Sequence, residues 1–129
     1  MMMAPTLSKK ERIVSNLLIE TLFGQGNSES LAAYPIRVIY TQIEQQQDCA
    51  PVQILISVPK KRFKHAVDRN RVKRQVREAY RHHKQLLYNK VEEGKQQLVA
   101  FVWLSDKHMP SSEVEKKIKM LLEKIAAKI

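Results

Sequence analysis

The sequence predicts a single α+β domain in which helices cover one side of a β-sheet. Apolar residues recur at helical spacing in three segments, alternate with polar residues in two others, and run without interruption in one more. The chain has 129 residues, enough for one domain with a modest core and too few for two ordinary ones. We therefore expect one domain over residues 1–129, with residues 1–7 disordered.

The first helix is expected over residues 8–24. Four apolar residues follow helical spacing there: Ile13, Leu17, Leu18 and Leu22. Its start stays open, because Ser8 and Ser15 are equally good N-caps. Gly24 is placed to end it.

Two strands are expected next, after a polar link over residues 27–33 that leaves room for a short extra strand. Apolar and aromatic residues of segment 34–43 fall on one face: Tyr34, Ile36, Val38 and Tyr40. Residues 52–58 alternate in the same way. A loop over 44–51 joins the two segments, so we expect them to pair as an antiparallel hairpin.

A long helix is expected from an N-cap at Asp68 to about Tyr88. Its apolar stripe follows helical spacing: Val72, Val76, Ala79, Tyr80, His83 and Leu87. Residues 98–104 are continuously apolar, as in a central strand buried on both faces. Ser112 and Glu115 have the spacing of a capping box for a last helix.

The charge of the chain is concentrated in one segment. The formal net charge is +10, and residues 60–84 carry +9 of it. That segment holds eleven bases: Lys60, Lys61, Arg62, Lys64, Arg69, Arg71, Lys73, Arg74, Arg77, Arg81 and Lys84. It holds only two acids, Asp68 and Glu78. A basic block on a nearly neutral remainder indicates a surface for a polyanion such as nucleic acid.

The basic helix carries the strongest functional indication. Arginine guanidinium groups match phosphate oxygens in two-pronged geometry, and the Asn70 amide can bind a base edge or a ribose hydroxyl. The alternative is a solvated charged face, which usually carries compensating acids four residues away. Glu78, close to Arg74, is the only acid within Arg71–Arg81, so the alternative is disfavoured.

The basic helix contains two successive runs, Arg69-Asn70-Arg71-Val72-Lys73-Arg74 and Arg77-Glu78-Ala79-Tyr80-Arg81. Together they closely resemble the most distinctive helix of the protein subunit of bacterial ribonuclease P. The segments Ile56-Ser57-Val58, Lys60-Lys61 and Ala66-Val67 resemble the approach to that helix. The resemblance covers roughly residues 12–104 and is specific in 56–81. The chain departs from the family at Pro59, where serine is usual, at Phe63, near which the family has glycine, and at Ile19, where an aromatic is usual.

The resemblance implies an αβββαβα two-layer sandwich with a left-handed βαβ crossover, although such connections are right-handed in about 98% of cases. It implies a protein that binds the catalytic ribonuclease P RNA and holds the 5′ leader of precursor tRNA. Magnesium would serve the RNA subunit, with none bound tightly by the protein. The RNA-binding residues would be Lys60, Lys61, Arg62, Lys64, Arg69, Asn70, Arg71, Lys73, Arg74, Arg77 and Arg81.

The resemblance also implies a leader groove lined by Ile19, Phe23, Val38 and Tyr40. Aromatic side chains over a basic floor hold single-stranded nucleic acid by stacking. The alternative is that these side chains pack in the core. For Phe23 and Val38 the groove and the core interpretations are given equal weight. For Phe101 and Trp103, inside the continuously apolar segment, core packing is favoured.

No catalytic or metal-ligating set is expected in the protein itself. The four histidines lack ligand spacing and the acids are scattered. One cysteine excludes an internal disulfide and suits a reducing cytoplasm. No signal peptide or membrane span is evident, and no obligate protein partner is implied. The remaining alternatives are a plain binding module, such as a ribosomal or DNA-binding protein, and a protein-only ribonuclease.

Overall fold

The computed structural model of the protein describes residues 13, 23, 28–44 and 50–129. Its strands are β1 (Glu29–Ala33), β2 (Ile36–Glu44), β3 (Val52–Ser57) and β4 (Lys95–Trp103). Its helices are α2 (Ala66–His83), α3 (Gln85–Tyr88) and α4 (Ser111–Lys128). The expected helix over residues 8–24, apart from Ile13 and Phe23, lies outside the described residues, as does the expected disorder of residues 1–7.

The four strands form one sheet in the order β1-β2-β4-β3. β1 and β4 flank β2 and both pair with it antiparallel, whereas β3 runs parallel to β4. The predicted hairpin between residues 34–43 and 52–58 is therefore wrong. The continuously apolar β4 takes the place between them, because only an inner strand covered on both faces buries such a run. β1 lies within the 27–33 link, where the sequence leaves room for a short extra strand.

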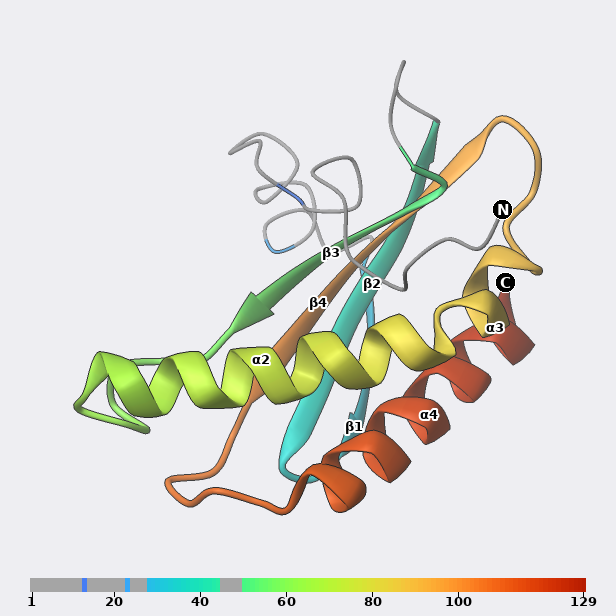
Figure 1. Cartoon of the computed structure of the whole chain (residues 1–129). Coiled ribbons are helices and arrows are strands. Elements are labelled where there is room, and N and C mark those ends of the chain that lie inside the picture. The colour runs from blue at the N-terminus through green and yellow to red at the C-terminus, as the bar shows by residue number, and fades with distance from the viewer. Residues whose placement is uncertain (1–12, 14–22, 24–27, 45–49) are drawn as a thin grey trace.

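The connection from β3 through α2 to β4 is a left-handed crossover, as the family resemblance implies. With α2 in front of the sheet, the chain leaves β3, crosses along α2 and α3, and returns down β4 beside β3 (Figure 1). Helices α2 and α4 form a second layer over one face of the sheet (Figure 1). The α+β two-layer prediction is confirmed.

Most of the core lies between the sheet and this helix layer. Strand residues facing the helices are almost fully buried there: Ile36, Val38, Tyr40, Val99, Phe101 and Trp103. The opposite face of β4 is also covered, since Leu98 and Ala100 pack with Ile13. The Ile13 main-chain N–H donates to the Ile54 carbonyl at 2.9 Å. β4 is thus buried on both faces, as the sequence predicts.

The helix boundaries differ from those expected. α2 begins at Ala66, with His65 in the N-cap position, so Asp68 lies in the first turn. The helix gives way at Lys84 to the separate short α3. α4 begins at Ser111 after Pro110 and has no side-chain cap. Both predicted caps are wrong, because each helix begins before the predicted cap residue, so Asp68 lies inside α2 and Ser112 inside α4. The carboxylates of Asp68 and Glu115 contact His108 and His83. None of the helices in the described part of the chain is long and apolar enough to cross a membrane.

Candidate nucleic-acid interface

The basic connector between β3 and α2 is anchored by one aromatic stack. Phe63 is buried, and its ring lies 4.6 Å from the His108 ring at an interplanar angle of 21°. His108 Nε2 lies 3.1 Å from the Asp68 carboxylate, which ties the loop before α4 to the start of α2. Lys60, Lys61 and Lys64 remain exposed around this anchor. The contacts of Phe63 and Asp68 with His108 therefore hold the connector in place, and its lysines extend from it into solvent.

Three of the predicted RNA-binding arginines, Arg62, Arg69 and Arg81, are engaged by the protein itself, and the first two lie at the connector. Arg69 donates hydrogen bonds to the carbonyl oxygens of Phe63 at 2.9 Å and Lys64 at 3.0 Å. Arg62 lies 3.4 Å from the exposed Asp106 carboxylate. The Arg69 guanidinium is thus directed toward the main chain of the connector and is occupied by the protein's own carbonyl groups.

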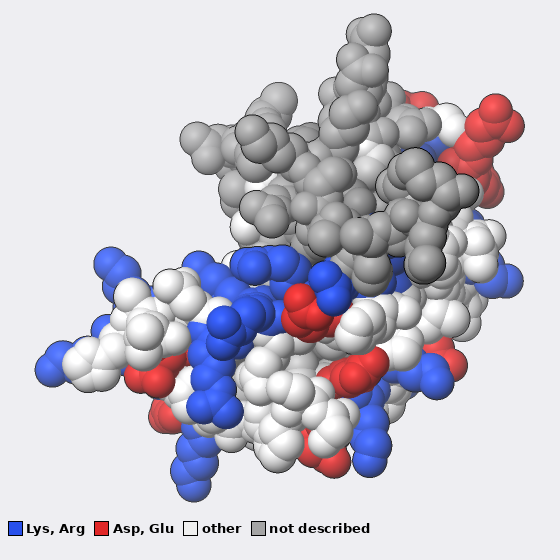
Figure 2. Space-filling model, in the orientation of Figure 1, with Lys and Arg blue, Asp and Glu red and all other residues white. Residues whose placement is uncertain are grey.

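The outward side of α2 carries cationic side chains that are not paired with an acid of the described chain. Asn70, Arg71 and Arg74 are exposed, and Lys73 and Arg77 are half-buried. Within the described residues, none of these five has a hydrogen-bond or ion-pair partner. Figure 2 shows Lys and Arg side chains gathered over α2 and around its first turn. This surface extends the connector lysines into one continuous basic patch.

The single acid of the helix interior does not neutralise this patch. Glu78 pairs with Arg81 at 2.6 Å and not with Arg74, the neighbour expected from the sequence. Arg81 is consequently the one predicted cation of α2 with an acidic partner in the described chain. The free charges are concentrated in the first half of the helix.

Helices α2 and α4 are joined by a histidine pair. His82 Nδ1 and His83 Nε2 lie 3.3 Å and 3.0 Å from the same Glu115 oxygen on α4. The hydrogen bond from His83, with a further one from His82, holds the pKa of Glu115 below its usual value against the opposing effect of burial. In the described ranges, no three His, Cys, Asp or Glu side chains come together as a metal site.

The predicted groove residues are not brought together on an open face. Val38 is fully buried and Tyr40 is 2% exposed, so both side chains pack in the core and Tyr40 does not present the open stacking face that was expected of it. Burial, together with the neighbouring Glu29 carboxylate, raises the pKa of Tyr40 to about 12. Phe23 is 47% exposed, and Ile19 lies outside the described residues.

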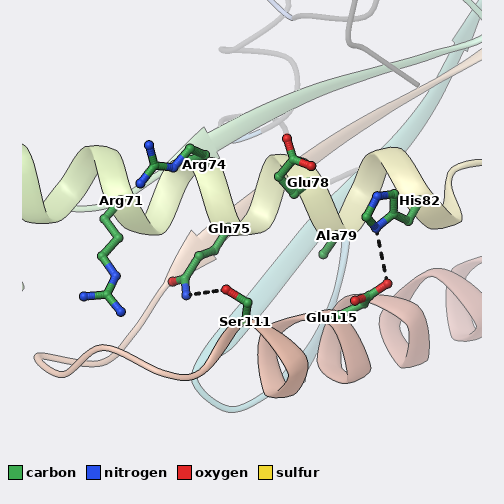
Figure 3. A pocket seen from close by; sticks show the side chains of 8 residues that line it. All are labelled: Arg71, Arg74, Gln75, Glu78, Ala79, His82, Ser111 and Glu115. Atoms are coloured by element: carbon green, nitrogen blue, oxygen red, sulfur yellow. Dashed lines mark hydrogen bonds and ion pairs between the residues drawn. The ribbon is translucent and has the colours of Figure 1, made fainter. Parts of the chain in front are cut away.

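Sequence reasoning missed the residues that organise the interface. Phe63 and His108 are 45 positions apart in the chain, so no local pattern joins them. No sequence pattern marks Gln75, whose Nε2 donates to the Met109 carbonyl at 2.9 Å and to Ser111 Oγ at 3.0 Å. Gln75 and Ser111 line a cavity of about 340 Å³ between α2 and α4 (Figure 3).

A basic helix and connector mounted on a four-stranded α+β sandwich define a nucleic-acid-binding protein. Comparisons with known proteins agree. The family described as Ribonuclease P matches residues 7–126. The ribonuclease P protein component of Porphyromonas gingivalis is 40% identical over 124 residues, which cover 95% of this chain and 88% of that protein. That of Chlorobium phaeobacteroides is 37% identical over 95 residues, covering 72% of this chain and 64% of that one.

Solved structures agree on the fold. The RNase P protein of Staphylococcus aureus matches with a TM-score of 0.64 at 24% identity, over 90% of this chain and 94% of that chain. The RNase P protein of Thermotoga maritima matches with a TM-score of 0.63 at 21% identity, over 88% and 96%. The chain belongs to the ribonuclease P protein family. Membership makes it a subunit of an endoribonuclease complex that has an RNA partner.

Proposed function

We propose that this chain binds the catalytic RNA subunit of ribonuclease P through α2 and the basic connector, and so assists removal of the 5′ leader from precursor tRNA. One observation carries the proposal. Asn70, Arg71 and Arg74 stand exposed on the first half of α2, without partners among the described residues. Unpaired guanidinium groups on a rigid helix are suited to folded RNA, whose backbone offers phosphates at fixed positions.

Catalysis is assigned to the RNA and not to protein side chains. The carboxylates beside the basic patch are already engaged: Asp68 with His108, Glu78 with Arg81, and Glu115 with His82 and His83. A carboxylate that already accepts a hydrogen bond from a neighbouring side chain is a poor general base and a poor ligand for magnesium. These residues do not fit a tight magnesium site, so magnesium is proposed to act with the RNA.

Phe23 is the proposed contact for the precursor leader. It is the one predicted groove residue that the structure shows with an exposed ring. Base stacking on an aromatic ring is tolerant of sequence, as a leader of variable sequence requires. The buried Val38 and Tyr40 would support the sheet beneath such a site and would not touch the leader themselves. The proposed setting is the cytoplasm, with the RNA subunit and precursor tRNA as partners and no obligate protein partner.

The test is a cleavage assay with precursor tRNA and magnesium. We expect protein alone to leave the substrate intact, and we expect the protein to raise cleavage by the ribonuclease P RNA at low magnesium. Cleavage by protein that is free of RNA would favour a protein-only ribonuclease. Binding to many unrelated RNAs, without any effect on the ribonuclease P RNA, would favour a plain binding module.

A further inference from the structure

The cavity between α2 and α4 contains a side-chain hydroxyl, that of Ser111, which the proposed function does not use. It runs from Arg71 and Arg74 at one end to the His82–Glu115 pair at the other, and the Gln75–Ser111 hydrogen bond lies between them (Figure 3). The buried Ala79 also lines it. The cavity measures about 340 Å³, which is ample for a phosphate group.

The acids that line the cavity are engaged by residues of the protein. Glu78 is paired with Arg81 at 2.6 Å, and Glu115 accepts from both His82 and His83. Arg71 and Arg74 have no such partner within the described residues. The arginine end of the cavity therefore carries uncompensated positive charge, and a charged ligand placed there must be an anion.

The Ser111 hydroxyl is oriented by its neighbour. Gln75 Nε2 donates to Ser111 Oγ at 3.0 Å, and the Met109 carbonyl, which also accepts from Nε2 at 2.9 Å, fixes which end of the Gln75 amide faces Ser111. Because Ser111 Oγ accepts this hydrogen bond, its own hydrogen is available to donate elsewhere. Ser111 is exposed at the mouth of the cavity, so that hydrogen can reach an incoming oxygen.

We propose that this cavity is a phosphate site, in which Arg71, Arg74 and the oriented Ser111 hydroxyl together bind one backbone phosphate of the RNA partner. The proposal rests on the proposed function and deepens it: the RNA contact is not confined to α2 but extends onto the start of α4. Gln75 is a positioning residue, acting through Ser111. Guanidinium groups and a hydroxyl donor supply the charge-assisted hydrogen bonds that a phosphate requires.

The test compares two aspartate substitutions at adjacent positions. Ser111→Asp places a negative charge at the cavity, whereas Ser112→Asp places the same charge one residue later on the same helix, at an exposed position that does not line the cavity. Binding to the ribonuclease P RNA is measured from about 50 to about 200 mM salt, with a melting curve for each variant. Ser111→Ala, which removes only the hydroxyl, guards against misfolding of the aspartate variant.

We expect Ser111→Asp to weaken RNA binding about tenfold and to make the salt slope shallower by about 0.7 to 0.9, the loss of one phosphate contact. Ser111→Ala should weaken binding less, and Ser112→Asp should bind within about twofold of the parent. Equal effects of the two aspartates would overturn the proposal. A failure of the parent protein to bind the RNA at all would instead overturn the proposed function.

Inorganic phosphate provides the second arm, because the same chemistry would hold a free anion. Its titration is followed through the NMR signals of the Gln75 side-chain amide. Shifts that accompany the loss of RNA affinity in Ser111→Asp support a backbone-phosphate site. If phosphate shifts these signals while both aspartate variants bind RNA alike, the cavity takes free phosphate and its assignment to RNA is wrong.

Discussion

Arg69 holds the main chain of Phe63, to whose carbonyl its guanidinium donates a hydrogen bond at 2.9 Å. A second bond at 3.0 Å reaches the Lys64 carbonyl. The first arginine of the Arg69-Asn70-Arg71 run therefore shapes the connector, while Arg71, two positions along the helix, is exposed. Two identical side chains in one motif thus have different physical roles.

The first prediction separates these roles. Arg69→Ala should lower the free energy of unfolding by about 1.5–3 kcal/mol, because it leaves two carbonyls without their charged donor. Arg71→Ala should change it by less than about 0.5 kcal/mol, as for an ordinary surface substitution, yet should weaken binding to the RNA subunit. Urea unfolding and RNA binding of both variants check this. Equal stability losses would contradict the assignment.

The second prediction concerns salt. About five to eight phosphate contacts from the connector lysines and the α2 cations should give a slope of log K against log salt of about −4 to −8. Titrating ribonuclease P RNA with protein at several salt concentrations measures it. Lys117→Ala on α4, outside the basic patch, is the control and should keep the parental slope. A slope near zero would mean that the patch is not the contact surface.

Sequence reasoning succeeded where local pattern decides structure and failed where distant contacts do. Helical spacing located α2 and α4, an uninterrupted apolar run located β4, and the Arg69-Asn70-Arg71 run located the basic helix. The partner of β2 could not be found in this way, since alternation says which face is buried and not which strand lies alongside.

The candidate site shows the same limit. The alternating pattern around Tyr40 would be the same whether the apolar face of its strand contacted a ligand or packed against a helix. Only the packing of α4 against that face decides the matter, and it buries Tyr40. Likewise, Asp68 has the chemistry of an N-cap, but His108, 40 residues away, takes its carboxylate.

The third prediction follows from this burial. Tyr40→Ala should lower the free energy of unfolding by about 3–5 kcal/mol, the cost of removing a large buried side chain. Tyr40→Phe keeps the ring and should cost no more than about 1.5 kcal/mol, with precursor and mature tRNA bound in the parental ratio. Urea unfolding and tRNA binding of both variants decide it. A fully stable Tyr40→Ala that loses only leader binding would show that the ring serves the leader.

The fourth prediction concerns pH and Glu115. Hydrogen bonds from His83 and His82 hold its pKa below its usual value, so its carboxylate is easier to keep charged in the folded protein than in the unfolded chain. The stabilisation is present above the usual glutamate pKa and is lost as pH falls through the lowered one. Glu115→Gln should therefore reduce the loss of unfolding free energy between about pH 5 and pH 3. The difference from the parent should be no more than about 1 kcal/mol, because Glu115 and the histidines are partly exposed to solvent. Thermal melts across that range measure it, with Glu123→Gln as an exposed control on the same helix. An unchanged acid profile in Glu115→Gln would contradict the assignment.

The last prediction concerns Phe23 and the leader. Its ring is 47% exposed, so Phe23→Ala should leave the melting temperature close to that of the parent. A lost stack is worth about 1–3 kcal/mol per base, so the holoenzyme should bind leader-bearing precursor tRNA more weakly by that amount and bind mature tRNA as before. Tyr34→Ala is the matched control: Tyr34 is 66% exposed in the turn between β1 and β2, and no leader role is assigned to it. Equal losses for the two variants would indicate a general aromatic effect, and equal losses for the two tRNAs would place Phe23 outside the leader path.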